Sequence, residues 1–570
     1  MQLHHRYKTW SVSLAMLAAI AIAPACNKDK LAQFNTNPDN ILNPPLKSLL
    51  PTAITKMHGN NFEAFYDNIR TISVWAQATV RKNGNGATFT VQTNNVNQRY
   101  NIFYTDIAPH LVKIENMIDA LPADQKPRYV YMRAIPGVIR AYYAWYISDV
   151  VGSIPYKEAF QARQGGTITP AYDSQSSLFA TLEAELKAIV NTLKTKQPVE
   201  QEMFGTSDLY YGKDNATAIG KWVKAANSLR LRMAMRLLKV APERAKGIIT
   251  EVLADNGGLI SSVAEEWVFN AGASFTSDGN WNPYPDQGFS GEKNLVDFMW
   301  NSADPRLRLF FRKNSWTQEN FNAAKAQGKI AASAVWDARQ YYGQYSSPDA
   351  STDPTKARFF ASITIKNGSS DVVLDTISPI QQRLFQAEWN NGTGFTTFHL
   401  ITYAEVCFMR AEIAALGLSG ESASDWYYKG IDASIESYDK IAKAAAIHDY
   451  VAVDPAEVAA YKTKPDIVFN AAKALEQIAA QSFINHYKNP SEAWAQIKRT
   501  GMPNANTILP LEVFKNEGTV LTMPRRFPVN YPLTGDLNFA NKQKAIEDMI
   551  KDPGFGLPTE ISGRVWWDKP

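Results

Sequence analysis

The feature that most constrains the fold is a series of helical segments separated by short turns. The stretch 176–193, SSLFATLEAELKAIVNTL, repeats leucine or isoleucine every three or four residues from Leu178 to Ile189 and follows a Pro/Asp/Ser start signal. Similar patterns occur in six other segments: 129–147, 221–239, 402–418, 425–445, 468–487 and 491–499. In the first of these, Pro136 and Gly137 predict a kink or break. Helices joined by short turns pack as antiparallel hairpins, and several hairpins stack into a solenoid. We therefore expect a mainly α fold with hairpins at about 100–240 and 400–500.

The stretch between about 271 and 387 has a different character. Gly, Asn, Pro, Asp and aromatic residues dominate it, as in SDGNWNPYPDQGFSG and QYYGQYSSPDASTDP. A long irregular stretch inside a folded protein is either disordered or functional, and many aromatic residues argue against disorder. We expect an irregular ligand-binding region here. The last segment, 510–570, is also rich in loop residues and is expected to wrap over the surface.

Residues 1–25 have the pattern of a lipoprotein signal peptide. A basic start precedes the uncharged run SVSLAMLAAIAIA at 11–23, which is shorter than the ~20 residues that a membrane-spanning helix needs. Small residues then lead into Cys26, and this resembles a bacterial lipobox, although Ala23 stands where leucine is usual. Cleavage would leave Cys26 as the N-terminus, with its sulfur carrying a diacylglycerol. The acyl chains would hold the protein on its membrane.

The other interpretations of Cys26 are a chance thiol or one half of a disulfide. Its one possible partner within the chain is Cys407, which lies in an apolar helical stretch and is expected to be a buried small side chain. The polar, Asn/Pro-rich sequence that follows Cys26 predicts a tether over 26–45. The folded domain is then 46–570.

Composition and motifs exclude several classes of function. The 59 basic and 55 acidic residues interleave without a basic tract, so no nucleic-acid partner is expected. Phosphate-binding loops, nucleophile elbows and the histidine pair of a zinc protease helix are all missing from the sequence. We predict no cofactor and leave metal binding open. A glycosidase needs only two carboxylates at the right separation, and the sequence does not exclude one.

Two charged sets on helices have an ordinary interpretation and a functional one. Glu405 and Glu412 lie two turns apart on one helix and are a possible catalytic pair, but solvent-facing helix charges are the more common case. Arg230, Arg232 and Arg236 lie off the apolar stripe of 221–239. They fit an acidic ligand, or, more commonly, a solvated or ion-paired helix face.

Nine segments in order along the chain are similar to segments of the SusD/RagB family of nutrient-binding outer-membrane lipoproteins of Bacteroidetes. The segments are FNTNPDN from Phe34, SDVVGSIPYKEAF from Ser148, PAYDSQSSLFATLEAEL from Pro170, KWVKAANSLRLRMAMRL from Lys221, DPRLRLFF from Asp304, TYAEVCFMRAEIAALGLSG from Thr402, EAWAQIKRTGMPN from Glu492, MPRRFPVNYP from Met523 and RVWWD from Arg564.

The resemblance implies a set of tetratricopeptide-like helical hairpins that form a solenoid-like scaffold around an irregular ligand-binding region. It also implies a surface-exposed, lipid-anchored outer-membrane protein without catalytic activity. Such a protein binds a nutrient, commonly an oligosaccharide, and acts as a lid on a SusC-like TonB-dependent transporter. The sequence CNKDK after the lipobox resembles signals that route such lipoproteins to the cell surface.

The resemblance carries over no ligand residues, so the predicted site rests on physical chemistry. Flat rings stack on the apolar faces of sugars, and neighbouring polar side chains bind hydroxyl groups. The predicted ligand-binding residues are the loop aromatics Trp281, Tyr284, Trp336, Tyr341, Tyr342 and Tyr345, with Arg81 and Asn83 as weaker candidates. The opposing interpretation is that these rings pin the loops to the helical body. A surface glycoside hydrolase and a structural or adhesive lipoprotein remain the alternative functions.

Overall fold

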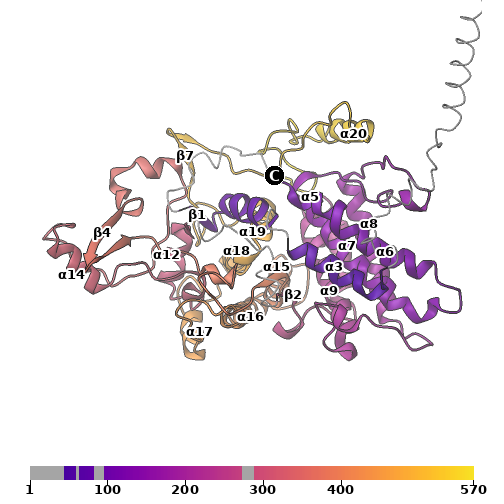
Figure 1. The fold of residues 1–570 in the computed structure, drawn as a ribbon, viewed down its shortest axis with the longest axis horizontal. Coiled ribbons are helices and arrows are strands. Elements are labelled where there is room, and N and C mark those ends of the chain that lie inside the picture. Colours follow the sequence, from indigo (N-terminus) through magenta and orange to yellow (C-terminus); the bar gives the residue numbers. More distant parts are fainter. Residues whose placement is uncertain (1–43, 60–62, 82–95, 272–287) are drawn as a thin grey trace, which may run out of the picture. The chain divides into compact units, whose positions relative to one another are not determined.

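The structure is a computed structural model that describes residues 44–59, 63–81, 96–271 and 288–570 (Figure 1). The chain divides into two units, 1–48 and 49–570, and the second contains the helical hairpins. The predicted signal peptide and almost all of the predicted tether, including Cys26, lie outside the described residues. The boundary between tether and folded domain stays a prediction.

Helices dominate both halves of the second unit, which confirms the mainly α prediction. Consecutive helices of the N-terminal half pack on one another, α6 on α7, α7 on α8, α8 on α9 and α9 on α10 (Figure 1). In the C-terminal half α15 packs on α16 and α18, and α18 packs on α19. The bounds of these helices are Ala108–Asp119 for α6, Val130–Val151 for α7, Gln175–Lys194 for α8, Asn215–Leu237 for α9, Pro242–Ala254 for α10, Tyr403–Ala415 for α15, Ala423–Ala444 for α16, Ala474–Asn485 for α18 and Pro490–Thr500 for α19.

Helix α8 shows how local sequence sets these elements. Ser174 has an extended backbone, and its hydroxyl accepts a hydrogen bond from the Ser177 amide at 3.3 Å, which caps the N-terminus. Leu178, Leu182 and Leu186 are fully buried against the neighbouring helices. The apolar period and the start signal therefore act together, and the prediction for this segment is confirmed.

Helix α7 differs from the sequence-based expectation. Pro136 and Gly137 predicted a kink or break, but one continuous helix runs from Val130 to Val151. Gly137 instead permits a close contact with α8, since a Cβ there would lie 2.7 Å from Cδ1 of Ile189. Tight packing between two helices explains the glycine, and surrounding contacts offset the cost of the proline.

The stretch 271–387 contains more regular structure than its composition suggests. Among its described residues, short helices form at Lys293–Asn301 (α12), Leu307–Phe310 (α13) and Gln318–Ala326 (α14). An antiparallel hairpin of β4 (Ser362–Asn367) and β5 (Ser370–Asp375) packs on α14 through a small apolar core around Ala324, Ile365 and Leu374. Turns and single bridges connect these elements, so the region is irregular but not without helices.

The remaining elements tie distant segments together. Strand β2 (Trp267–Asn270) pairs antiparallel with β6 (Thr397–Ile401), which joins the end of the N-terminal half to the start of α15. The C-terminal segment carries α20 (Phe539–Ile550) and buries Phe527 and Trp567 in the body. Further described elements include α3 (Leu46–His58), η1 (Glu63–Ile72), α4 (Ser73–Trp75), α5 (Gln98–Ile102), η3 (Phe103–Ile107), α17 (Pro455–Lys462), β7 (Lys515–Asn516) and β8 (Thr519–Val520).

Candidate ligand-binding site

The candidate site is organised by a short antiparallel ladder between β1 (Thr79–Arg81) and β3 (Phe289–Gly291). Arg81 is paired with Phe289, so the chain that leaves β1 and the chain that enters β3 meet at the same end of the ladder. These are the attachment points of the two loops that carry Asn83, Trp281 and Tyr284. Those three predicted residues lie outside the described part of the chain.

A third segment joins the ladder at its other end. The Gln344 amide donates to the Gly291 carbonyl at 2.9 Å, and the Lys293 amide donates to the Gln344 carbonyl at 2.9 Å. Tyr345 follows Gln344 directly. Since a strand rises about 3.3 Å per residue, Gly291 lies about 7 Å along β3 from the pair formed by Arg81. Predicted site residues from separate segments therefore converge on one ladder.

Tyr342 and Tyr345 are half-buried, and cationic groups surround both rings. The Arg339 and Arg358 guanidinium carbons lie 4.4 and 5.3 Å from the centroid of Tyr342. The Nζ atoms of Lys293 and Lys356 lie 5.4 and 4.8 Å from the centroid of Tyr345. The buried ring of Phe359 also belongs to this cluster. It lies perpendicular to the ring of Tyr345, with the two ring centroids 5.1 Å apart. Cations over ring faces hold the rings in place and add positive charge to the surface.

Tyr341 and Trp336 lie beside this cluster but have other neighbours. The ring of Tyr341 is 6.1 Å from that of Trp300 on α12, which is a large apolar side chain exposed to solvent. Trp336 contacts Phe321 of α14, with ring centroids 5.6 Å apart. The structure therefore groups Tyr342 and Tyr345 around Phe359. Tyr341 lies beside Trp300, and Trp336 lies beside α14.

Most polar groups around the rings have partners within the protein, although Oε1 of Glu292 is buried without one among the described residues. The Tyr342 hydroxyl donates to Asp337, and this hydrogen bond holds the pKa of Asp337 below its usual range. Beneath Tyr345, burial raises the pKa of Glu292, whose carboxylate caps α12 by accepting from the Asn294 and Leu295 amides. Burial likewise raises the pKa of Glu512, which accepts from two backbone amides at Ser346 and Ser347. The charge of Glu512 also contributes to the raised pKa of Glu292, so these two carboxyls lie close enough to interact.

Sequence reasoning missed Trp300, Arg358 and Phe359 as members of this site. Trp300 lies at the end of a short helix where the pattern predicted loops. Arg358 and Phe359 belong to a 3₁₀ turn, Pro354–Phe359. The one signal in the sequence was the close spacing of aromatic and basic residues between 336 and 360. Which of these side chains come into contact depends on pairing between segments that are distant in the sequence.

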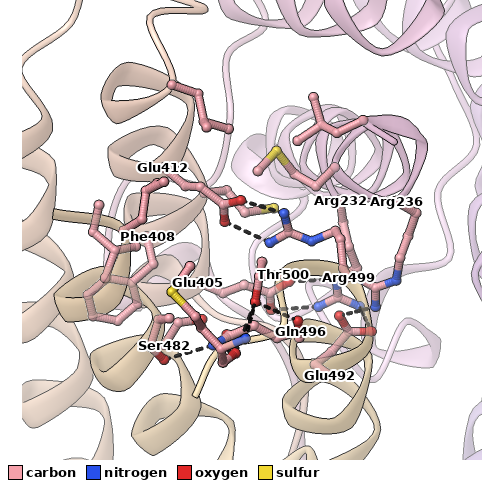
Figure 2. A pocket seen from close by; sticks show the side chains of 18 of the residues that line it. Arg232, Arg236, Glu405, Phe408, Glu412, Ser482, Glu492, Gln496, Arg499 and Thr500 are labelled. Atoms are coloured by element: carbon pink, nitrogen blue, oxygen red, sulfur yellow. Dashed lines mark hydrogen bonds and ion pairs between the residues drawn. The ribbon is translucent and has the colours of Figure 1, made fainter. Parts of the chain in front are cut away.

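A cavity of about 390 Å³ lies apart from this site, between the end of α9 and the helices α15, α18 and α19 (Figure 2). Members of both charged sets from the sequence line it, but Arg230 does not. Glu405 and Glu412 line it, yet each is bound to an arginine from another helix: Arg232 binds Glu405 at 2.5 and 2.6 Å, and Arg499 binds Glu412. The side chain of Glu405 is buried, so it is not one of the solvent-facing helix charges that are the more common case.

The three arginines of α9 are buried and ion-paired. Arg230 binds Glu183 at 2.8 Å, and Arg236 binds Glu492 at 2.5 Å. Burial alone would raise the pKa of Glu492, but Arg236 and Arg232 outweigh that effect and lower it. Since every member has a partner, neither set has the free carboxylate pair or the free cations that its functional interpretation required.

Two further findings concern the described residues alone. They contain no group of three or more His, Cys, Asp and Glu side chains placed to hold a metal ion. None of their helices combines the length and the apolar character that crossing a bilayer demands.

Comparisons with known proteins agree on the family. A family model described as starch-binding and associating with the outer membrane, the SusD-like family, matches residues 38–532. No curated protein matches significantly. Among solved structures, a chitin-binding protein superposes with a TM-score of 0.69 at 22% identity, covering 92% of this chain and 100% of that chain. A chitin-binding SusD homolog from Flavobacterium johnsoniae superposes with a TM-score of 0.64 at 19% sequence identity, covering 92% of this chain and 98% of that chain. A fold of tetratricopeptide-like hairpins and a match over most of the sequence identify this chain as a member of the SusD-like family.

Proposed function

We propose that the protein is a lipid-anchored, surface-exposed outer-membrane protein that binds a glycan and delivers it to a TonB-dependent transporter, on which it acts as a lid. Family membership and the family description support the location and the glycan. The observation that carries the ligand site is the meeting of β1, β3 and the segment of Gln344 and Tyr345 at one ladder.

Chitin oligosaccharides are the first ligands to test, because two solved relatives are named for binding chitin. An N-acetylated sugar offers apolar ring faces for stacking and amide and hydroxyl groups for hydrogen bonds. The tyrosines supply the rings. Arg358, which has no ion pair within the described residues, supplies a free donor.

Replacing Tyr341 or Tyr345 by alanine is expected to weaken binding of chitohexaose roughly tenfold, since a stacking contact contributes about 0.5–1.5 kcal/mol beyond burial. Isothermal titration calorimetry measures the affinity, on variants whose melting temperature is unchanged. Tyr531→Ala is the matched control, because Tyr531 is 48% exposed on the C-terminal segment. If alanine variants of all six predicted aromatics bind like wild type, the site lies elsewhere.

The lid role predicts a stable complex with the transporter. A lid that seals a barrel should bury more than ~2,000 Å² against it. Purification of the native protein from outer membranes in mild detergent is expected to recover a TonB-dependent transporter in equal amount. Repeated recovery of the lipoprotein by itself would contradict the lid.

The alternative functions make different predictions. A surface glycoside hydrolase would release new reducing ends from oligosaccharides. Glu405 and Glu412 do not support it, since both are ion-paired. A structural or adhesive lipoprotein would show neither saturable binding of a small ligand nor a transporter partner.

A further inference from the structure

The cavity between α9, α15, α18 and α19 has the dimensions of a ligand site. Its volume of about 390 Å³ falls within the range of ~300–1,000 Å³ that is usual for small-molecule pockets. It belongs to the helical scaffold, and it shares no lining residue with the aromatic site around Tyr345. Nothing in the proposed glycan function uses it.

The walls of this cavity are mostly apolar. Three methionines from different elements line it, and methionine adapts readily to ligands of varied shape. The other apolar lining residues are Leu238, Pro242, Phe408, Leu416, Leu418, Leu475, Ile478 and Ala479, and the methionines are Met235, Met409 and Met502. Ser482, Gln496 and Thr500 also line the cavity, but most of the wall surface is apolar, so much of a sugar would lie against it without hydrogen-bond partners, which is costly. The walls therefore favour a hydrocarbon chain.

The charged groups at the base of the cavity are neutralised by one another. Arg232 is bound to Glu405, and Arg236 is bound to Glu492 (Figure 2). Each arginine is buried with its carboxylate, so the base presents no net charge to a ligand. Nη1 of Arg232 and Nε of Arg236 have no hydrogen-bond partner among the described residues, but a charged head group would meet no net opposite charge at the base.

The mouth is different, because cations are in excess there. Lys239 follows α9, is exposed, and has no ion pair within the described residues. Partial burial lowers its pKa, and Arg525, Arg564 and Arg499 lower it further, while Asp568 raises it. In this group Asp568 binds both Arg525 and Arg564, and Glu412 binds Arg499, so two carboxylates balance part of the charge of four cations. Of these residues, Lys239, Glu412 and Arg499 line the cavity itself, together with Lys246, which is paired with Glu243.

We propose that this cavity is a second binding site, for a fatty acid or a ligand of the same chemistry, with the hydrocarbon chain among the methionines and the carboxylate at Lys239. Apolar walls, a neutral base and a positive mouth match a chain that ends in one negative charge. Neither a neutral sugar nor a cationic ligand fits this distribution.

The test uses the full-length chain carrying Cys26→Ala, so that no attached acyl chain competes. The uncharged fluorescent probe N-phenyl-1-naphthylamine is bound first, and palmitate is then titrated. Palmitate is expected to displace the probe saturably with one site per chain. Lys239→Glu should weaken palmitate binding roughly tenfold, since it turns a weak attraction into a repulsion. It should leave the affinity for the neutral probe unchanged.

Two further variants complete the design. Lys213→Glu makes the same charge change just before the opposite end of α9 and should bind palmitate like wild type. Ala479→Trp fills the cavity and should abolish binding of both probe and palmitate, with the urea midpoint showing that the variant is folded. Absence of saturable displacement, or equal palmitate affinity in wild type and Lys239→Glu, would overturn the proposal. Unchanged binding by a folded Ala479→Trp would do the same.

Discussion

Replacing Glu492 by alanine is expected to destabilise the protein by about 3–5 kcal/mol, because it leaves buried cations without their counter-charge. Glu492 binds Arg236 at 2.5 Å and lies 3.8 Å from Arg232, and all three side chains are almost completely buried. Urea denaturation followed by circular dichroism measures the loss. The cost arises mainly from the uncompensated arginines, so a variant that removes charge from both sides should recover part of it.

The matched control is Glu243→Ala, which removes a carboxylate paired with Lys246 at 2.8 Å on the surface. That pair is exposed, and the change should cost less than about 1 kcal/mol. The pH dependence gives a second check. The pKa of Glu492 is lowered to about 2 in the folded state, so its stabilisation is fully present above the unfolded pKa of about 4.3 and is lost as the pH falls through the folded pKa. Equal losses for the two variants would show that burial of the Glu492 cluster is not what matters.

Replacing Cys26 by alanine is expected to move the protein from almost entirely membrane-bound to released, or to leave it as an uncleaved precursor of higher mass. The reason is that several acyl chains on one residue provide the whole anchor. Cell fractionation and labelling with radioactive palmitate measure the change. Cys407→Ala is the control, since Cys407 is a buried free cysteine on α15 and should not affect labelling. A Cys26→Ala protein that is still labelled or still equally membrane-bound would refute the lipid anchor.

Sequence patterns predicted what depends on neighbouring residues. Helix α8 was predictable because its cap at Ser174 and its leucine period lie within the helix itself. Cys407 was predictable as a buried thiol because the surrounding stretch is apolar throughout. In both cases the residues that determine the local structure lie within a single helical segment of the sequence.

Features that depend on distant partners could not be predicted. The arginines of α9 fitted a solvated or ion-paired helix face, but the sequence could not identify their partners Glu405 and Glu492, which lie on helices far along the chain. The sequence predicted one irregular region that carries all the loop aromatics. In the structure Tyr345 lies next to the β1–β3 ladder, whereas Trp336 contacts Phe321 of α14. Period and composition carry no information about which strands will pair, or in which register.

The long reach of the α9 ion pairs has a consequence for how the chain folds. Arg232 and Arg236 find carboxylates 173 and 256 residues later. In a regular helical repeat each unit touches only its neighbours, so folding can begin in one unit and spread. Here Arg232 lies in the first half of the array, and both of its carboxylate partners among the described residues, Glu405 and Glu492, lie in the second half. Contacts at such sequence separation slow folding. A chain truncated before α15 should not form a stable domain, and the array should unfold in one cooperative step.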